Sequence, residues 1–279
     1  MIPQPQVGTR VLDAGWRAAA YCLHPRVIGW SLLPLLLAVL LTLGLSWFFW
    51  EPAVTAVRAN MESWLVVDAL RQRFDVKLHS VIAPLILMAL ALPVVMAMAI
   101  VLVAALMTPA LTRLVAERRF PALEKRHGGT FWGGLLGSMG ATALALLLLL
   151  LSLPFWLIPP VILVLPPLIW GWLSMRVFCY DVLADHASVD ERQSLLRELR
   201  WPLLAIGVVS GYLGAAPSLI FAFGALGFAL APLLMPIAIW LYMLVFAFTA
   251  LWFAHFLLAE LARRRGSPEV VEPVQALPT

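Results

Sequence analysis

The start of the apolar run after Pro25 combines the features of an anion-binding site. Proline fits the first turn of a helix, so Pro25 predicts a helix start here. The first turn of a helix has backbone N–H groups without helical partners and the positive end of the helix dipole, and both attract anions. Arg26, with the N–H groups of Val27 and Ile28, would then form an oxyanion site. The alternative is that Arg26 only anchors the chain at a membrane surface.

Two further groups of polar residues lie next to apolar sequence. Asp181, Asp185 and His186 are spaced so that they could ligate a cation, or they could be the polar end of a helix. His255 lies in an apolar block without Asp, Glu, Lys or Arg, where an ionisable group is a functional candidate; the alternative is a neutral histidine near the interface. Walker, zinc-ligand and nucleophile-elbow patterns are absent from the sequence. We therefore predict no enzyme, no catalytic residue, no metal and no cofactor.

The composition excludes a soluble globular enzyme. Hydrophobic residues make up 63% of the 279 residues and charged residues 12%, whereas soluble domains carry roughly 25% charged residues. Long unbroken apolar blocks favour membrane-spanning helices over the alternating segments of a β-barrel. The formal net charge of +4 then indicates basic loops beside a membrane and not nucleic-acid binding.

Charge-free blocks predict the membrane elements. Residues 27–50 and 78–112 each predict one long transmembrane helix. The blocks at 128–175 and 201–259 are too long for one span, and each predicts a helical hairpin broken by Pro and Gly. The turns are expected near 159–167 and 224–232. The predicted fold class is an all-α polytopic integral membrane protein with two long transmembrane helices and two Pro/Gly-broken hairpins. Glycines spaced four apart, as at 133 and 137 or 207 and 211, indicate internal packing or an oligomer interface.

The distribution of Lys and Arg predicts the orientation. If residues 51–77 alone face outward, 15 of the 19 basic residues lie inside and 4 outside, as the positive-inside rule requires. Both termini are therefore predicted to be cytoplasmic. Three segments outside the apolar blocks are predicted helical: an interfacial amphipathic helix at 6–23, an amphipathic segment at 51–77, and a cytoplasmic helix at 188–200 that begins with the capping box of Ser188 and Glu191. We predict one domain at 1–265 and a flexible tail at 266–279.

Three stretches of the sequence resemble the CysZ-like sulfate permeases, which are grouped in one superfamily with the etoposide-induced membrane proteins. The first stretch runs from Gly15 through Tyr21-Cys22-Leu23-His24-Pro25 to Leu32-Leu33-Pro34-Leu35-Leu36. The second runs from Thr108-Pro109-Ala110-Leu111 to Val115-Ala116-Glu117, and the third joins Cys179-Tyr180-Asp181 to Arg192, Leu195, Leu196, Arg197 and Arg200. The resemblance spans about residues 10–260.

The resemblance implies a bacterial inner-membrane protein that is at least dimeric and passes sulfate. One motif differs from the family pattern, because the family's Gly-Leu-Arg turn aligns with Arg26, Val27 and Ile28. An arginine therefore occupies the glycine position, from which it could reach the same anion, or the change could mean another substrate. We predict transport of sulfate or a related small oxyanion, with the lipid bilayer, the oxyanion and a second copy of the chain as partners. A membrane scaffold without a transported substrate is the alternative.

Overall fold

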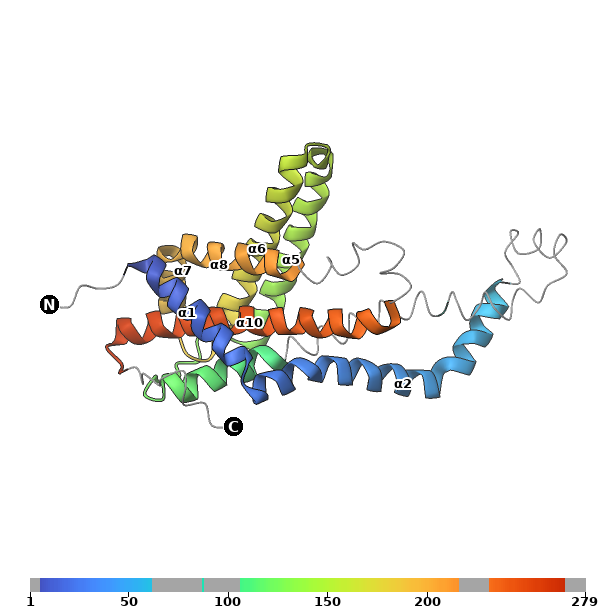
Figure 1. Ribbon diagram of the computed structural model, residues 1–279, viewed down its shortest axis with the longest axis horizontal. Coiled ribbons are helices and arrows are strands. Elements are labelled where there is room, and N and C mark those ends of the chain that lie inside the picture. Colours follow the sequence, from blue (N-terminus) through green and yellow to red (C-terminus); the bar gives the residue numbers. More distant parts are fainter. Residues whose placement is uncertain (1–5, 62–86, 88–105, 216–230, 269–279) are drawn as a thin grey trace. The chain divides into compact units, whose positions relative to one another are not determined.

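Helices are the regular elements of the described residues. The computed structural model describes residues 6–61, 87, 106–215 and 231–268, which include no strand (Figure 1). The elements are α1 (Val7–Cys22), α2 (Pro25–Met61), a helix at 106–119, α5 (Phe131–Ser152), the 3₁₀ helix η1 (Leu153–Leu157), α6 (Pro159–Ala184), α7 (Val189–Glu198), α8 (Arg200–Ala215) and α10 (Ala231–Arg265). The chain forms two compact units, Leu33–Ala104 and the remaining residues, and each is described by itself.

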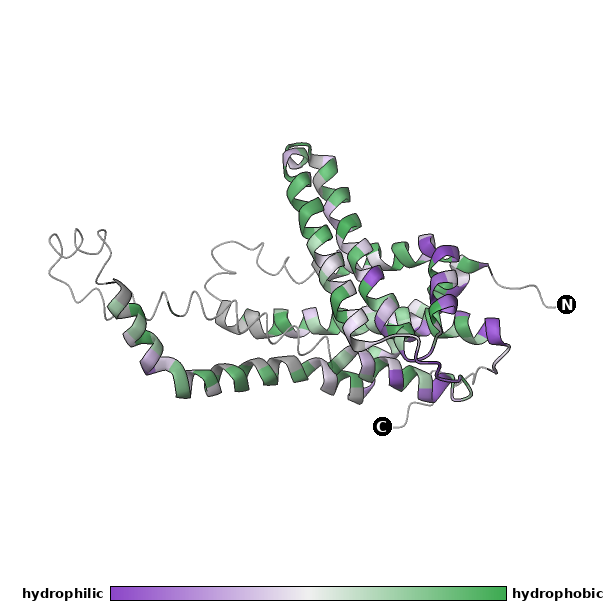
Figure 2. Ribbon diagram, turned by 180° about the vertical axis from the view of Figure 1, so that it is seen from behind, coloured by the Kyte–Doolittle hydropathy of each residue, from purple (hydrophilic) through white to green (hydrophobic). Residues whose placement is uncertain are grey.

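Four of the described helical segments are long and apolar enough to cross a membrane. They are Val39–Val57, Trp132–Leu157, Leu163–Ala184 and Ile237–Arg265. Residues along α5 and α6 are mainly hydrophobic, whereas hydrophilic residues gather on α7 and at the C-terminal end of α10 (Figure 2). These features confirm the predicted all-α membrane fold.

The first long helix extends further than the sequence predicted. The charge at Glu51 set the predicted end at Trp50, but α2 continues to Met61. Part of the segment predicted at 51–77 is therefore the end of the same helix. Three predicted parts lie mostly outside the described residues: the remainder of that segment, the second predicted span at 78–112 and the predicted tail.

Helix α1 packs against α10 through small side chains. Ala14, Ala18 and Cys22 are buried, and a Cβ atom on Gly15 would lie 3.0 Å from the ring of Trp252. The Trp252 indole N–H donates to the Val11 carbonyl oxygen at 2.9 Å. Small residues at this contact let the two helices approach closely.

The apolar face predicted for residues 6–23 is divided between two environments in the structure. Gly15, Ala18 and Cys22 contact protein, whereas Leu12 and Leu23 are exposed together with Trp16. At 100° per residue these residues still lie on one side of the helix, so the protein covers one edge of the predicted apolar face and the exposed residues form its other edge. Burial also raises the pKa of the Cys22 thiol to about 12.

The turn between α5 and α6 comes earlier than the predicted 159–167. It is formed by η1 and Ile158, and Pro159 and Pro160 then begin α6, where a missing N–H costs little. Pro166 and Pro167 lie inside α6 instead of ending it. Pro167 cannot donate to the carbonyl oxygen of Leu163, and the Tyr212 hydroxyl of α8 donates to that oxygen instead. A neighbouring helix thus satisfies the acceptor that proline leaves open.

Helices α6 and α8 meet at glycines. A Cβ atom on Gly171 would lie only 2.6 Å from the Val208 nitrogen, and a Cβ on Gly207 would overlap the Gly171 carbonyl oxygen. The glycine pair at 207 and 211 therefore serves packing within the chain. A Cβ on Gly137 of α5, by contrast, would meet nothing within 4 Å.

The capping box predicted at Ser188 and Glu191 is confirmed. The Glu191 N–H donates to Ser188 Oγ, and the Ser188 N–H donates to Glu191 Oε2, so α7 begins at Val189. Arg265, at the end of α10, donates from Nε to Glu191 Oε1 at 2.9 Å and to the carbonyl oxygens of Glu124 and His186. These bonds fix the C-terminal end of α10 to α7 and to the residues after the helix at 106–119.

A basic cavity between α1, α10 and the helix at 106–119

A cavity of about 540 Å³ lies where α1, the C-terminal part of α10 and the end of the helix at 106–119 meet. It has room for a small oxyanion with several waters, since one water occupies about 30 Å³. Four guanidinium groups and two carboxylates line it, which leaves two surplus positive charges. The charged lining residues are Arg10, Arg17, Arg119, Arg263, Asp13 and Glu260.

Glu260 binds two of these arginines. Its side chain is only 3% exposed, and its two carboxylate oxygens accept from Arg10 and from Arg263. A buried carboxylate is stable only when it is paired and hydrogen-bonded. Glu260 therefore holds α1 against α10, and its negative charge offsets the positive charge of Arg10.

Arg119 is the most deeply buried of the four arginines. Its side chain is 7% exposed, it lies over the ring of Phe120, and its Nη1 is 3.1 Å from Nδ1 of His255. Arginine can only donate, so His255 Nδ1 must accept and the ring proton must be on Nε2. His255 is therefore a neutral imidazole.

The His255 ring also presents a buried donor. The residue is fully buried, its ring meets that of Tyr21 edge to face with centroids 4.7 Å apart, and Nε2 has no hydrogen-bond partner among the described residues. A buried N–H group without an acceptor is costly. The wall of the cavity therefore holds the positive guanidinium of Arg119 and the neutral ring of His255 side by side.

Asp13 is held less firmly than Glu260. Its carboxylate is 51% exposed and accepts from Arg17 Nε at 2.9 Å, four residues along the same helix. The same oxygen lies 3.6 Å from Nη2 of Arg119, which is an ion-pair distance. Asp13 therefore lies between the two arginines that Glu260 does not bind.

The structure places the predicted anion site at the first turn of α2. Pro25 begins this helix, as predicted. The N–H groups of Val27 and Ile28 both donate to the His24 carbonyl oxygen, at 2.9 and 3.1 Å, so neither is open to an anion. Val27 itself is fully buried. The side chain of Arg26 lies outside the described residues, and anion binding there remains a prediction.

The polar residues that follow α6 connect the end of this helix to neighbouring segments. Asp185 lies 3.9 Å from Nδ1 of His127, and its carbonyl oxygen accepts from the His127 N–H. Burial lowers the pKa of His186, whose carbonyl oxygen accepts from Arg265. The described residues contain no cluster of three or more metal-ligating side chains.

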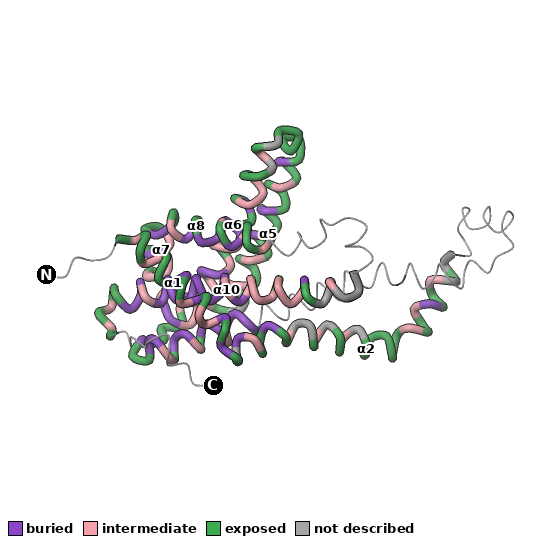
Figure 3. Tube along the Cα trace, viewed as in Figure 1, coloured by how far each residue is buried: buried purple, intermediate pink, exposed green. Residues whose placement is uncertain are grey.

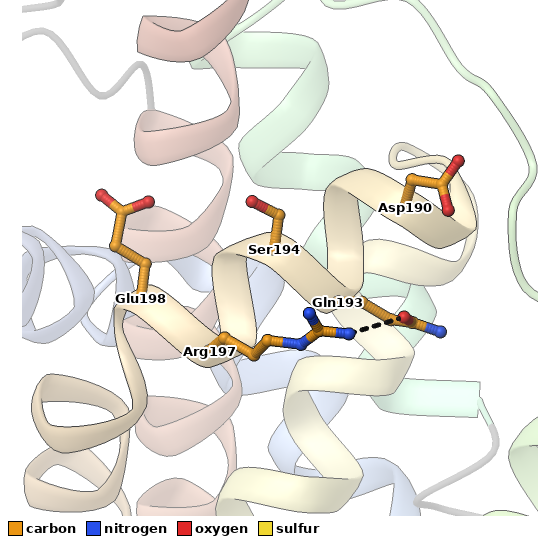
Figure 4. A pocket seen from close by; sticks show the side chains of 5 residues that line it. All are labelled: Asp190, Gln193, Ser194, Arg197 and Glu198. Atoms are coloured by element: carbon orange, nitrogen blue, oxygen red, sulfur yellow. Dashed lines mark hydrogen bonds between the residues drawn. The ribbon is translucent and has the colours of Figure 1, made fainter.

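A second, open pocket lies on the outer face of α7, where Arg197 donates to Gln193 Oε1 at 3.3 Å (Figure 4).

The sequence pattern indicates His255 as a candidate but not the charged residues around it. Arg119 follows Arg118 in a basic segment, where both resemble ordinary surface charges. Asp13 and Glu260 lie 247 positions apart, and only the packing of α1 on α10 brings them to one cavity. One signal was available: Glu260 directly follows an apolar block, where a buried carboxylate would need arginine partners.

The long apolar helices define a multi-pass α-helical membrane protein. The profile of the family described as sulfate transporter CysZ/etoposide-induced protein 2.4 matches residues 14–224, which is more than half of the chain. The chain therefore belongs to this family, and the resemblance predicted from the sequence is confirmed. Comparisons with curated proteins and with solved structures gave no match.

Proposed function

We propose that this protein passes sulfate or a related small oxyanion across the bacterial inner membrane, and that the basic cavity binds the anion on its path. The family supports a sulfate-transporter-like protein. The observation that carries the proposal is the buried pair of Arg119 and His255 in a cavity with surplus positive charge.

The donors of this cavity match the chemistry of an oxyanion. Guanidinium groups bind planar or tetrahedral oxyanions with two parallel hydrogen bonds. Apolar walls around a charged site strengthen its attraction for the opposite charge. Phe256 and the alanines at 14, 259 and 262 form such walls beside Arg119. A dianion bound there would neutralise the two surplus charges.

The proposed orientation puts this cavity at the cytoplasmic end of the path. The 15-to-4 division of basic residues favours cytoplasmic termini, and the cavity lies between α1 and the C-terminal part of α10. Reporter fusions at residue 65 should then report the outside, and fusions at 120, 188 and 270 the inside. A cytoplasmic signal at 65 would overturn this orientation.

Flux of radiolabelled sulfate into vesicles that contain the purified protein tests the function. We expect Arg119→Gln to reduce sulfate affinity by roughly 10- to 100-fold, because a hydrogen bond to a charged group contributes about 1.5–3 kcal/mol. Arg119→Lys should restore part of the loss, since an ammonium cannot form the two-pronged contact. Arg197→Gln, on the exposed face of α7, is the matched control and should leave the affinity unchanged.

The first turn of α2 is proposed as a second contact on the same path. Arg26→Ala should lower oxyanion affinity there by a similar factor without changing expression, because Arg10 and Arg17 still hold the N-terminus inside. Unchanged binding and flux in Arg26→Ala would remove this contact and leave the cavity. A correctly inserted wild type that passes no oxyanion would instead favour a membrane scaffold.

A further inference from the structure

We propose that the Asp13 carboxylate sets how fast the anion leaves the cavity, by competing with it for the guanidinium groups of Arg17 and Arg119. This inference rests on the proposed function. It assigns Asp13 the role of a release residue: the carboxylate moves aside when an anion binds and returns when the anion leaves.

The two carboxylates of the cavity differ in how firmly they are held. Glu260 is buried and accepts from two guanidinium groups, so it is a fixed part of the wall. Asp13 is half exposed, with one hydrogen bond to Arg17 on its own helix and a longer contact of 3.6 Å to Arg119. Exposed ion pairs within one helix are weak, because water screens both charges. Asp13 is therefore the carboxylate that an incoming anion can displace.

The buried donors stay on the protein when Asp13 moves. Arg119 is held over Phe120 and beside His255 Nδ1, which fixes the direction of its guanidinium plane. His255 is fully buried and lines the same cavity, so it keeps its place behind Arg119. An oxyanion bound near Arg119 would supply hydrogen-bond acceptor oxygens at closer range than the Asp13 carboxylate, which lies 3.6 Å from the Arg119 guanidinium.

The competition should depend on the charge of the anion. The energy of repulsion between Asp13 and a bound anion is proportional to the anion's charge, so a dianion is opposed about twice as strongly as a monoanion. Conduction requires binding that is strong enough for entrance and weak enough for release. Asp13 would supply the repulsion that lets a doubly charged anion leave a cavity with two surplus positive charges.

Equilibrium titration of the purified full-length protein with sodium sulfate and with sodium nitrate, at constant ionic strength, tests this role. We expect Asp13→Asn to bind sulfate about tenfold more tightly and nitrate about threefold more tightly than wild type. In vesicles the same variant should reach half-maximal sulfate flux at a lower concentration, but its maximal flux should fall because release is slower. A residue with only a structural role would not move affinity and maximal flux in opposite directions.

Two control variants make the test specific. Asp13→Glu keeps the charge and should behave as wild type, and Asp190→Asn removes an exposed carboxylate on α7 and should change neither anion. If wild type binds sulfate and Arg119→Gln weakens it, but Asp13→Asn binds no tighter, the release role is wrong and the transport proposal stands. If wild type neither binds nor passes any oxyanion, both are wrong.

Discussion

Helices α5 and α6 and the basic cavity at the end of α10 differ in how their side chains are stabilised. In the segment Trp132–Leu157 only 11% of the residues in the most apolar window are buried by protein, against 44% in Ile237–Arg265 of α10 (Figure 3). The side chains that α5 exposes are mostly leucines, which are stable in lipid without any partner. The cavity instead buries Arg119 and Glu260, and a buried charge is stable only with a partner of opposite charge or a hydrogen-bonding partner.

The two regions differ in how strongly stability depends on the exact neighbours of a side chain. An exposed leucine on α5 is stabilised by any apolar surroundings, so its exact neighbours matter little. A buried charge such as Glu260 depends on particular partners at hydrogen-bond distance. Substitutions should therefore be tolerated along α5 and costly around the cavity.

The largest effect is expected from removing the buried carboxylate of the cavity. Glu260→Gln leaves the partly buried guanidinium of Arg10 without its counter-charge and should lower the free energy of unfolding by about 3 kcal/mol. The control is Glu198→Gln, which breaks the contact of a 63% exposed carboxylate with Arg264 and should cost less than about 1 kcal/mol. Thermal unfolding of both variants in detergent measures the difference. Equal costs would contradict the contrast between buried and exposed pairs.

A smaller effect is expected where helices touch through glycine. Gly207→Leu would place a side chain into the backbone of α6 and should destabilise the protein by about 2–3 kcal/mol, because the backbones must separate. Gly137→Leu on α5 has open space around its Cβ and should leave the monomer stable. Unfolding temperature and size-exclusion chromatography measure the two variants. If Gly137→Leu changes the oligomer size alone, this face of α5 is a contact between copies.

The smallest effect is a pH dependence at α7. The hydrogen bond from Arg265, followed by the bond from the Ser188 N–H and the charge of Arg126, lowers the pKa of Glu191 to about 2, from an ordinary value of 4.5. Because the folded-state pKa is depressed, the stabilisation is complete above about pH 4.5 and is lost as the pH falls toward 2. The loss should be about 2 kcal/mol for this partly exposed group. Unfolding temperatures measured from pH 6 to pH 2 should fall in wild type and be flatter in Glu191→Gln.

Local patterns predicted the local structure well. The capping box at Ser188 and the helix start at Pro25 depend on neighbouring residues alone, and both are in the structure. Errors occurred where a distant segment changed the outcome. The prolines at 166 and 167 lie inside a helix, and Tyr212 of α8 supplies the donor that Pro167 lacks, which no neighbouring residue could have indicated.

The sequence by itself determined that this chain is an all-α membrane protein, because long charge-free runs can be stable only as helices in lipid. It also determined the family, through the pattern matched over residues 14–224. The tertiary structure decided which charges form the cavity. The charged and polar residues of the cavity come from three helices that are far apart in the sequence. Asp13 and Arg119 are indistinguishable there from surface residues, and the sequence does not show that they meet His255 and Glu260. Their pairing depends on distances of a few ångströms, which only the packing of α1 and the helix at 106–119 on α10 sets.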